Sequence, residues 1–145
     1  MILMKDGIYK QNVISKKDMF YIKDMKSHLA LFMNHIRDMK VTPKDKVFYM
    51  IGDVPNEEIM KVEFFIPIRE EVNTSVSGIR FHSYFGIDNM MSIRVKLDKD
   101  GVVMAVYRDL IDTINARGMI RTTGFFHVLS EARGEHYITI KVGYR

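Results

Sequence analysis

The chain has 145 residues, a length that suits one domain with a core of ordinary size. It contains no cysteine, which excludes disulfide frameworks, thiolate metal sites and thiol nucleophiles. The net charge is +4, but the basic excess consists mainly of lysines that alternate with aspartates in residues 1–46, so it predicts a solvated surface and no nucleic-acid partner.

The spacing of apolar side chains divides the chain into helices and strands. Apolar residues at three- and four-residue steps indicate two amphipathic helices, and runs rich in aromatic and β-branched residues indicate strands. In chain order, the predicted elements are a weak strand over 8–15, a helix over 24–39, strands over 47–51 and 62–66, a polar connector over 69–78, strands over 79–85 and 91–97 joined by a turn at 86–89, a helix over 102–117, and strands over 125–129 and 137–142.

Single residues mark the ends of the two predicted helices. Asp24 is expected to cap the first helix, and Pro43 lies beyond its end and prevents continuation. Asp98 or Asp100 is expected to cap the second helix, and Gly118 suits a left-handed residue that ends it. These signals limit each helix to about four turns.

The two halves of the chain match each other in the order and spacing of their elements. A shift of 78 residues lays Ile36–Ile51 on Ile114–Leu129 without a gap, and apolar positions coincide along it. We therefore predict a single α+β domain over residues 1–145, made of two β-α-β-β repeats with pseudo-two-fold symmetry and an antiparallel sheet with both helices on one face. Its parts are repeat one (about 8–68), the connector (69–78) and repeat two (about 79–145).

Alternation along the strands separates a core face from a second face. The core face is predicted to carry Phe48, Met50, Val62, Phe64 and Ile66 and their equivalents Phe126, Val128, Ile138, Ile140 and Val142. Tyr49 and His127 then occupy equivalent positions on the second face, beside Glu63 and Phe65. Because that face mixes aromatic and polar side chains, we expect it to form a cleft or an interface.

Short motifs along the chain carry a family resemblance. A turn with Pro43 and an aromatic strand follow the first helix in Val41–Tyr49, a strand in Glu63–Ile68 ends in Ile-Pro-Ile, and Tyr107–His127 repeats the outline. In these motifs the chain resembles the gyrase-inhibitor-like small-molecule-binding domains, which also serve as effector-binding domains of multidrug-responsive transcription activators. The resemblance covers nearly the whole chain.

The resemblance implies a ligand cleft where the sheets of two β-α-β-β halves meet. In the family this cleft is aromatic, and a glutamate on the first strand after the second helix accepts cationic ligands. The corresponding strand here, Phe125–Leu129, holds no glutamate, and Glu131 lies just beyond it. The chain is also similar to stand-alone relatives near bacterial type VII secretion and toxin loci, which implies a protein partner.

From the face assignment and the resemblance we predict a ligand site made of Tyr49, Glu63, Phe65, His82, Tyr84, His127 and Glu131. His127 is expected to have Tyr49 and Glu63 as neighbours, where it could act as a general base or as a pH-sensitive contact, although a structural role is favoured. No phosphate loop, dinucleotide motif or metal-ligand spacing is found, so we expect no cofactor and no metal, and we assign no catalytic residue.

Three functions are compatible with these features. The first is a stand-alone domain that binds a small organic ligand in a cleft on the sheet face away from the helices. The second is a protein-interaction component, either a homodimer or a partner of a type VII secretion or toxin locus, without small-ligand binding. The third and least favoured is a small hydrolase, so we lean against an enzyme. Because the sequence has no apolar run of about 18–20 residues and no signal-peptide core, we expect a cytoplasmic protein without a membrane partner.

Overall fold

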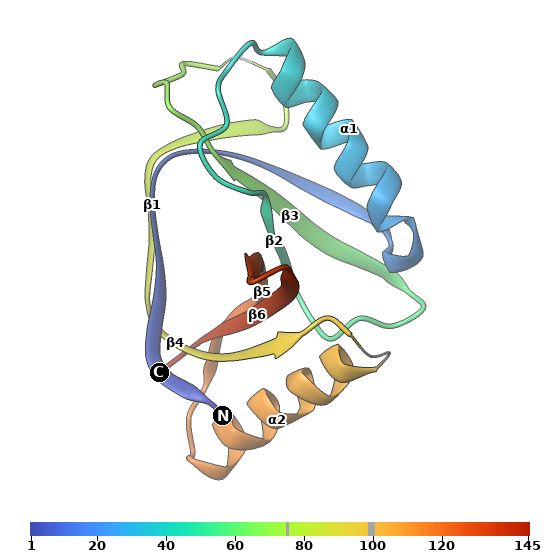
Figure 1. Ribbon diagram of the computed structural model, residues 1–145, viewed down its shortest axis with the longest axis vertical. Coiled ribbons are helices and arrows are strands. Elements are labelled where there is room, and N and C mark those ends of the chain that lie inside the picture. The colour runs from blue at the N-terminus through green and yellow to red at the C-terminus, as the bar shows by residue number, and fades with distance from the viewer. Residues whose placement is uncertain (75, 99–100) are drawn as a thin grey trace. The chain divides into compact units, whose positions relative to one another are not determined.

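The structure is a computed structural model that describes residues 1–74, 76–98 and 101–145 (Figure 1). Across these residues it contains antiparallel strands and two α-helices, which confirms the predicted α+β class. In chain order the elements are β1 (Leu3–Tyr21), the short 3-10 helix η1 (Ile22–Asp24), α1 (Met25–Asp38), β2 (Phe48–Ile51), β3 (Ile59–Pro67), β4 (Ile79–Lys96), α2 (Val102–Ala116), β5 (Arg121–Ala132) and β6 (Glu135–Tyr144).

The chain divides into two compact units. The middle unit contains Tyr9–Phe85, and the terminal unit combines Met1–Ile8 with Gly86–Arg145. The long strands β1 and β4 each contribute residues to both units. An order of strand, helix, strand, strand occurs twice, as β1-α1-β2-β3 and as β4-α2-β5-β6.

The strand pairing in the two units follows one pattern. In the middle unit β3 lies between β1 and β2, and in the terminal unit β6 lies between β4 and β5. Phe48 lies opposite Phe65, and Phe126 lies opposite Lys141. Phe48 and Phe126 are 78 residues apart, as in the shift that aligns the two halves, and Phe65 and Lys141 are 76 apart. Asn12 in β1 and Asn89 in β4 both have a left-handed backbone, with φ of 55° and 54°.

In the middle unit, helix α1 covers one face of the sheet (Figure 1). The ring of Phe32 on α1 lies 5.6 Å from the ring of Phe64 on β3, and Ile36 lies in the same buried cluster. Because alternate residues of a strand share a face, the buried residues Val62 and Ile66 join Phe64 there. The prediction that these three β3 residues form the core face is confirmed.

In the terminal unit, helix α2 packs on its own sheet through Tyr107. The ring of Tyr107 lies 5.1 Å from the ring of Phe125 on β5, in an edge-on arrangement typical of aromatic pairs. Leu110 and Ile114 of α2 are also buried. Neither helix in the described ranges is long and apolar enough to cross a membrane.

The predicted faces of β2 and β5 are wrong by one residue. Tyr49 lies opposite Phe64 in the strand pairing and packs against the α1 cluster, so it points toward the helix. His127 lies opposite Ile140 and bonds to Tyr107 on α2, so it also points toward a helix. Directly opposite residues of an antiparallel pair share a face, and the pairing therefore decides the orientation where both faces of a strand are apolar.

The predicted turn at residues 86–89 is also wrong, because β4 continues without a break from Ile79 to Lys96. The turn-forming residues are accommodated by a single left-handed residue, Asn89, inside the strand. Asparagine tolerates this conformation better than most residues do, and such a residue disturbs a strand locally without ending it. The connector of residues 69–78 contains no helix or strand in its described part, and residue 75 lies outside the described residues.

The helix ends agree in part with the predicted caps. Gly118 has a left-handed backbone, with φ of 65°, as predicted. Asp24 occupies the position before α1, but its side chain makes no capping bond, because its φ of −95° and ψ of 14° depart from the extended conformation that capping requires. Gly101, and not Asp98, precedes α2. Asp100 lies outside the described residues.

Candidate ligand site

A pocket of about 640 Å³ lies on the middle unit and contains one of the predicted site residues, Glu63. Glu63 lies on β3, directly opposite Lys17 on β1 and Met50 on β2, and these three side chains share the face that points away from α1. The residues that line the pocket are Lys17, Asp18, Met19, Met50, Gly52, Lys61, Val62 and Glu63.

The carboxylate of Glu63 is the distinctive group of this pocket. The residue is only 8 % exposed. Among the described residues, it forms no hydrogen bond and no ion pair, although Lys17 lies opposite and Lys61 lines the same pocket. Among the described residues, no buried side-chain oxygen lacks a hydrogen-bond partner, so the Glu63 carboxylate oxygens, which form no hydrogen bond, reach the surface of the pocket. They are therefore accessible to a positively charged ligand.

Aromatic side chains continue the same face beyond the pocket. Phe65, two residues after Glu63 on β3, stacks on Phe48 of β2 with ring centroids 4.8 Å apart and planes within 2°. Phe85 of β4 lies 4.8 Å from the Phe65 ring. His82 of β4 meets Phe85 edge-on at 5.6 Å. The predicted residues Glu63, Phe65 and His82 therefore belong to one neighbourhood of the middle unit.

His82 is held in place by a buried serine. Its Nε2 lies 2.8 Å from Oγ of Ser15 on β1, and Ser15 is itself directly opposite Phe65. Burial lowers the pKa of His82, the nearby charge of Arg80 lowers it further, and the negative charge of Glu63 acts in the opposite direction. Because the net pKa shift is downward from about 6.5, the imidazole is neutral at pH 7.

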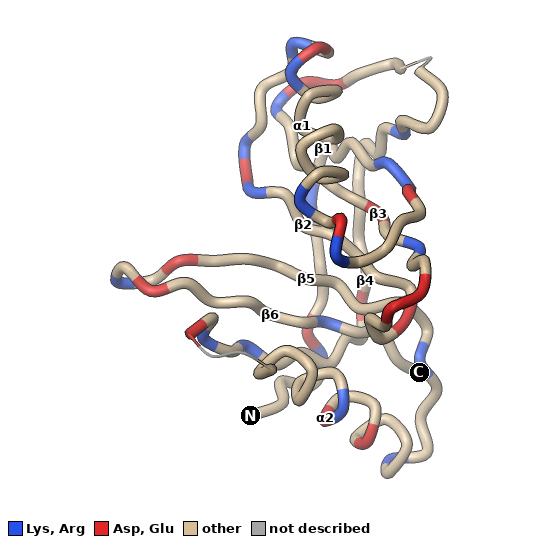
Figure 2. The backbone as a smooth tube through the Cα atoms, turned by 90° about the vertical axis from the view of Figure 1, so that its right-hand side faces the viewer, with Lys and Arg blue, Asp and Glu red and all other residues tan. Residues whose placement is uncertain are grey.

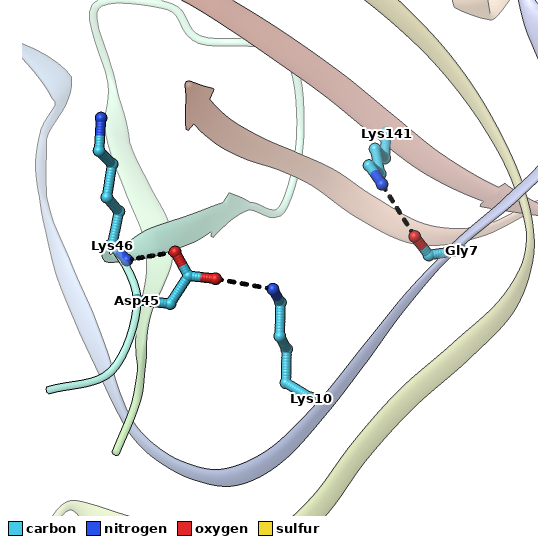
Figure 3. A network of polar contacts seen from close by, with 5 residues as sticks. All are labelled: Gly7, Lys10, Asp45, Lys46 and Lys141. Carbon is cyan, nitrogen blue, oxygen red and sulfur yellow. Dashed lines mark hydrogen bonds and ion pairs between the residues drawn. The ribbon is translucent and has the colours of Figure 1, made fainter. Parts of the chain in front are cut away.

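An ion pair fixes the segment that leads into β2. Lys10 Nζ on β1 lies 2.9 Å from Oδ2 of Asp45, and the backbone amide of Lys46 donates to Oδ1 of the same carboxylate (Figure 3). The hydrogen bond from Lys10 holds the pKa of Asp45 below its usual value. The contact joins β1 to the segment that precedes β2, which begins at Phe48.

The remaining predicted site residues lie elsewhere. Tyr84 is on β4 and is 59 % exposed, and Glu131 lies near the charged tip of the β5–β6 hairpin, 3.2 Å from His136 (Figure 2). Tyr49 and His127 point toward the helices, and burial raises the pKa of Tyr49. Within the described residues, no three His, Asp or Glu side chains gather into a group that could hold a metal ion.

Sequence reasoning missed three residues on this face, Lys17, Phe48 and Met50. Lys17 is one of several alternating charges and carries no motif. Phe48 and Met50 were assigned to the core because Phe48–Ile51 is apolar throughout, and alternation gives no signal in such a strand. The face of these residues could have been inferred only from their partners on β3, where polar and apolar side chains alternate.

Comparisons with solved structures place the fold among known proteins. The chain is similar to the EcmrR C-terminal domain, with a TM-score of 0.67, 14 % identity and coverage of 99 % of each chain. It is also similar to EcmrR in a complex with DNA, with a TM-score of 0.76 and 17 % identity, and it spans only 57 % of that chain's length. A third match, SAV2435 bound to tetraphenylphosphonium, has a TM-score of 0.51 and 9 % identity over 100 % of this chain and 93 % of that one.

These likenesses support, at the level of the fold, the resemblance to gyrase-inhibitor-like binding domains. A search of curated proteins finds no match. A family profile described as a domain of unknown function, DUF5085, matches residues 9–144. That match extends over nearly the entire sequence, and the chain belongs to the DUF5085 family.

Proposed function

We propose that this chain is a small-molecule-binding module and that its ligand is a lipophilic or aromatic cation held in the Glu63 pocket of the middle unit. The observation that carries the proposal is Glu63, a residue that is largely buried but whose carboxylate reaches a pocket of about 640 Å³ and has no ion-pair partner in the described chain. A bound cation would supply the missing charge.

The surroundings of Glu63 suit a ligand that is both apolar and positive. Met19 and Met50 line the pocket, and methionine side chains adapt to irregular apolar shapes. The Phe48 and Phe65 rings continue the same face and are themselves buried, so they add to the apolar surroundings of the pocket. His82 adds no positive charge at pH 7, because its pKa is lowered.

The fold relatives support the same ligand class. One protein with this fold was solved with tetraphenylphosphonium, a lipophilic cation. The sequence resemblance implies a cation-accepting glutamate on the strand after the second helix, whereas we propose that Glu63 on β3 serves here. We also propose that the chain is a single domain whose two halves are related by a pseudo-two-fold axis, with both helices on one face of the sheet. We propose a cytoplasmic location as well.

Isothermal titration calorimetry with tetraphenylphosphonium tests the proposal, with neutral triphenylphosphine oxide as the uncharged counterpart. We expect saturable binding of the cation and at least about tenfold weaker binding by Glu63→Gln, because the substitution removes the charge and keeps the shape. Glu71→Gln is the matched control, since it removes one carboxylate from an exposed position outside the pocket.

The control variant Glu71→Gln shows whether the cation binds at Glu63 specifically or responds only to the net charge of the protein. Equal losses of affinity in Glu63→Gln and Glu71→Gln would show that the cation responds only to net charge. Binding by Glu63→Gln at the wild-type affinity would remove Glu63 from the site. Absence of saturable binding by any of several aromatic cations would overturn the assigned ligand class.

A second candidate function, a protein-interaction component, has one specific observation in its favour. Met19, Tyr21 and Ile59 are exposed large apolar residues, and they continue the pocket face toward the end of β1. A homodimer or a partner of a secretion or toxin locus would cover them. Light scattering tests the homodimer, and a strict monomer at high concentration would exclude it. The hydrolase hypothesis loses its proposed base, because His127 is 1 % exposed and engaged with Tyr107.

A further inference from the structure

The terminal unit contains a second pocket whose chemistry is opposite to that of the Glu63 pocket. It has a volume of about 430 Å³, and its polar lining comes from Arg94, Lys141, Asp6 and the hydroxyl residues Ser92, Ser130 and Thr139. A shift of 76 residues lays the strand Val62–Ile66 on Ile138–Val142, so that Thr139 takes the position of Glu63 and Lys141 that of Phe65. The positions that carry an acid and a phenyl ring in the middle unit thus carry a hydroxyl and an amine here.

The strand pairing collects these groups on one face. Arg94 on β4 and Val128 on β5 both lie directly opposite Thr139 on β6, so the three side chains share a face across three strands. Ser130 follows two residues after Val128 and therefore points the same way. His127 bonds to Tyr107 of α2 from the other face, which leaves the pocket face away from the helix.

Lys141 is already neutralised within this pocket. Its Nζ lies 3.2 Å from Oδ2 of Asp6. The same Nζ donates to the Gly7 carbonyl oxygen at 2.8 Å (Figure 3). Ser92 Oγ donates to the same oxygen of Asp6 at 2.7 Å. Burial acts to raise the pKa of Asp6, but the hydrogen bonds from Ser92, Gly7 and Lys141 outweigh it and lower the pKa. Asp6 is therefore ionised at neutral pH, and this pair adds no net charge.

Arg94 is a cation of this pocket that has no acidic partner among the described residues. Its guanidinium lies 4.0 Å from the centre of the Tyr137 ring, and stacking of this kind limits the orientations of the guanidinium. Among the described residues it makes no ion pair and no side-chain hydrogen bond. The hydroxyls of Ser130 and Thr139 also make no hydrogen bond in that part of the chain. An oriented guanidinium beside two unused hydroxyl donors matches the requirements of an oxyanion.

We propose that this pocket of the terminal unit binds a small organic anion. Its carboxylate or phosphate group accepts hydrogen bonds from the Arg94 guanidinium and from the Ser130 and Thr139 hydroxyls. Leu3 and Val128 also line the pocket and provide apolar contact for the rest of the molecule. The site is independent of the proposed cation site, since it uses residues of the other unit.

Calorimetric titration with phenyl phosphate, benzoate and inorganic phosphate tests the site. We expect saturable binding of at least one of the two aromatic anions, and at least about tenfold weaker binding by Arg94→Gln. Arg94→Lys keeps the positive charge but loses the planar guanidinium, which can donate two hydrogen bonds to one anion, so we expect an intermediate affinity. Arg117→Gln, at the exposed end of α2, is the matched control and should bind as the wild type does.

The possible outcomes distinguish a phosphate ligand from a carboxylate ligand, and the anion site from the cation site. Binding of phenyl phosphate alone assigns a phosphate ligand, and binding of benzoate alone assigns a carboxylate. Wild-type affinity in Arg94→Gln, or an equal loss in Arg117→Gln, overturns the site, as does the absence of saturable binding by all three probes. Glu63→Gln should leave anion binding unchanged. A negative result for cation binding at Glu63 would therefore not count against the anion site. Thermal unfolding of each variant confirms that it is folded.

Discussion

The hydroxyl of Tyr107 on α2 and Nε2 of His127 on β5 form a hydrogen bond in the core of the terminal unit. Both residues are buried, and their rings meet edge-on with centroids 5.6 Å apart. A polar pair in an apolar core is tolerated when its members satisfy each other. The contact explains why a histidine is found on the helix-facing side of a strand.

Tyr107→Phe should destabilise the protein by about 1–3 kcal/mol, because it removes a partner of a buried polar group without creating a cavity. The free energy of unfolding from urea denaturation measures the effect. Tyr84→Phe removes the same hydroxyl from an exposed β4 position and should change stability by less than about 0.5 kcal/mol. Equal stabilities of Tyr107→Phe and the wild type would mean that the bond contributes nothing.

His82 should titrate below the ordinary histidine pKa of about 6.5, since burial and Arg80 disfavour the charged imidazole. The Cε1 proton shift followed by NMR between pH 8 and 4 gives the midpoint, and His82→Gln assigns the resonance. The unfolded state takes up the proton first as pH falls, so His82 should lower stability below about pH 6.5 and have no effect above it. A midpoint above 6.5 would contradict the described environment.

Asp6 should make the protein more stable above its unfolded pKa of about 3.9 than below it. Its folded pKa is lowered by Ser92, Gly7 and Lys141, so the stabilising contribution is present at neutral pH and is lost as pH falls through the folded value. Urea unfolding at a series of pH values should show a shallower acid decline for Asp6→Asn than for the wild type. Parallel declines would show that Asp6 is not engaged in the folded state.

Gly143→Ala should destabilise the terminal unit. A Cβ at this position would lie 2.6 Å from Thr122 Oγ1 and 2.8 Å from Thr123 Cγ2, which is closer than atoms pack. The Gly143 amide also donates to Thr123 Oγ1 at 2.8 Å, so relief of the clash would disturb that bond. Overpacking of this kind costs about 1–3 kcal/mol.

Gly52→Ala provides the comparison for Gly143→Ala. A Cβ at Gly52 would be 3.7 Å from its nearest neighbour, the Lys61 carbonyl oxygen, which is an ordinary contact. Its melting temperature should therefore stay close to the wild-type value, while that of Gly143→Ala falls. A matching decrease in both variants would assign the effect to the loss of glycine and not to the Thr122–Thr123 contact.

The sequence predicted the elements well where a periodic pattern was strong. The helix over 24–39 is observed as Met25–Asp38, and the helix over 102–117 as Val102–Ala116. The strand orientations failed where the pattern was absent, as in Phe48–Ile51, in which every residue is apolar. Only the partner strand, with polar Glu63 opposite Met50, reveals the face of such a segment.

The sequence predicted the kinds of side chain at the candidate site, but only some of the individual residues. Phe65 and His82 come together because the ring of Phe85 contacts both, and Glu63 is close enough to His82 to act on its pKa. An arginine in an alternating strand is ordinary, so the sequence alone does not distinguish Arg94 as a site residue. Its importance comes from the absence of an acidic partner among the described residues, and that is a property of the folded chain.

The composition of the terminal unit affects how the chain can be divided. Because Met1–Ile8 belongs with Gly86–Arg145, neither sequence half corresponds to a unit of the fold. A fragment that begins at Ile79 lacks Asp6 and Gly7, and it therefore leaves Lys141 without its carboxylate and its carbonyl acceptor. Fragments cut at the predicted repeat boundary are therefore poor substitutes for the protein. A circular permutant that joins the two ends and opens within 69–78 would keep residues 1–8 and 86–145 in one continuous segment.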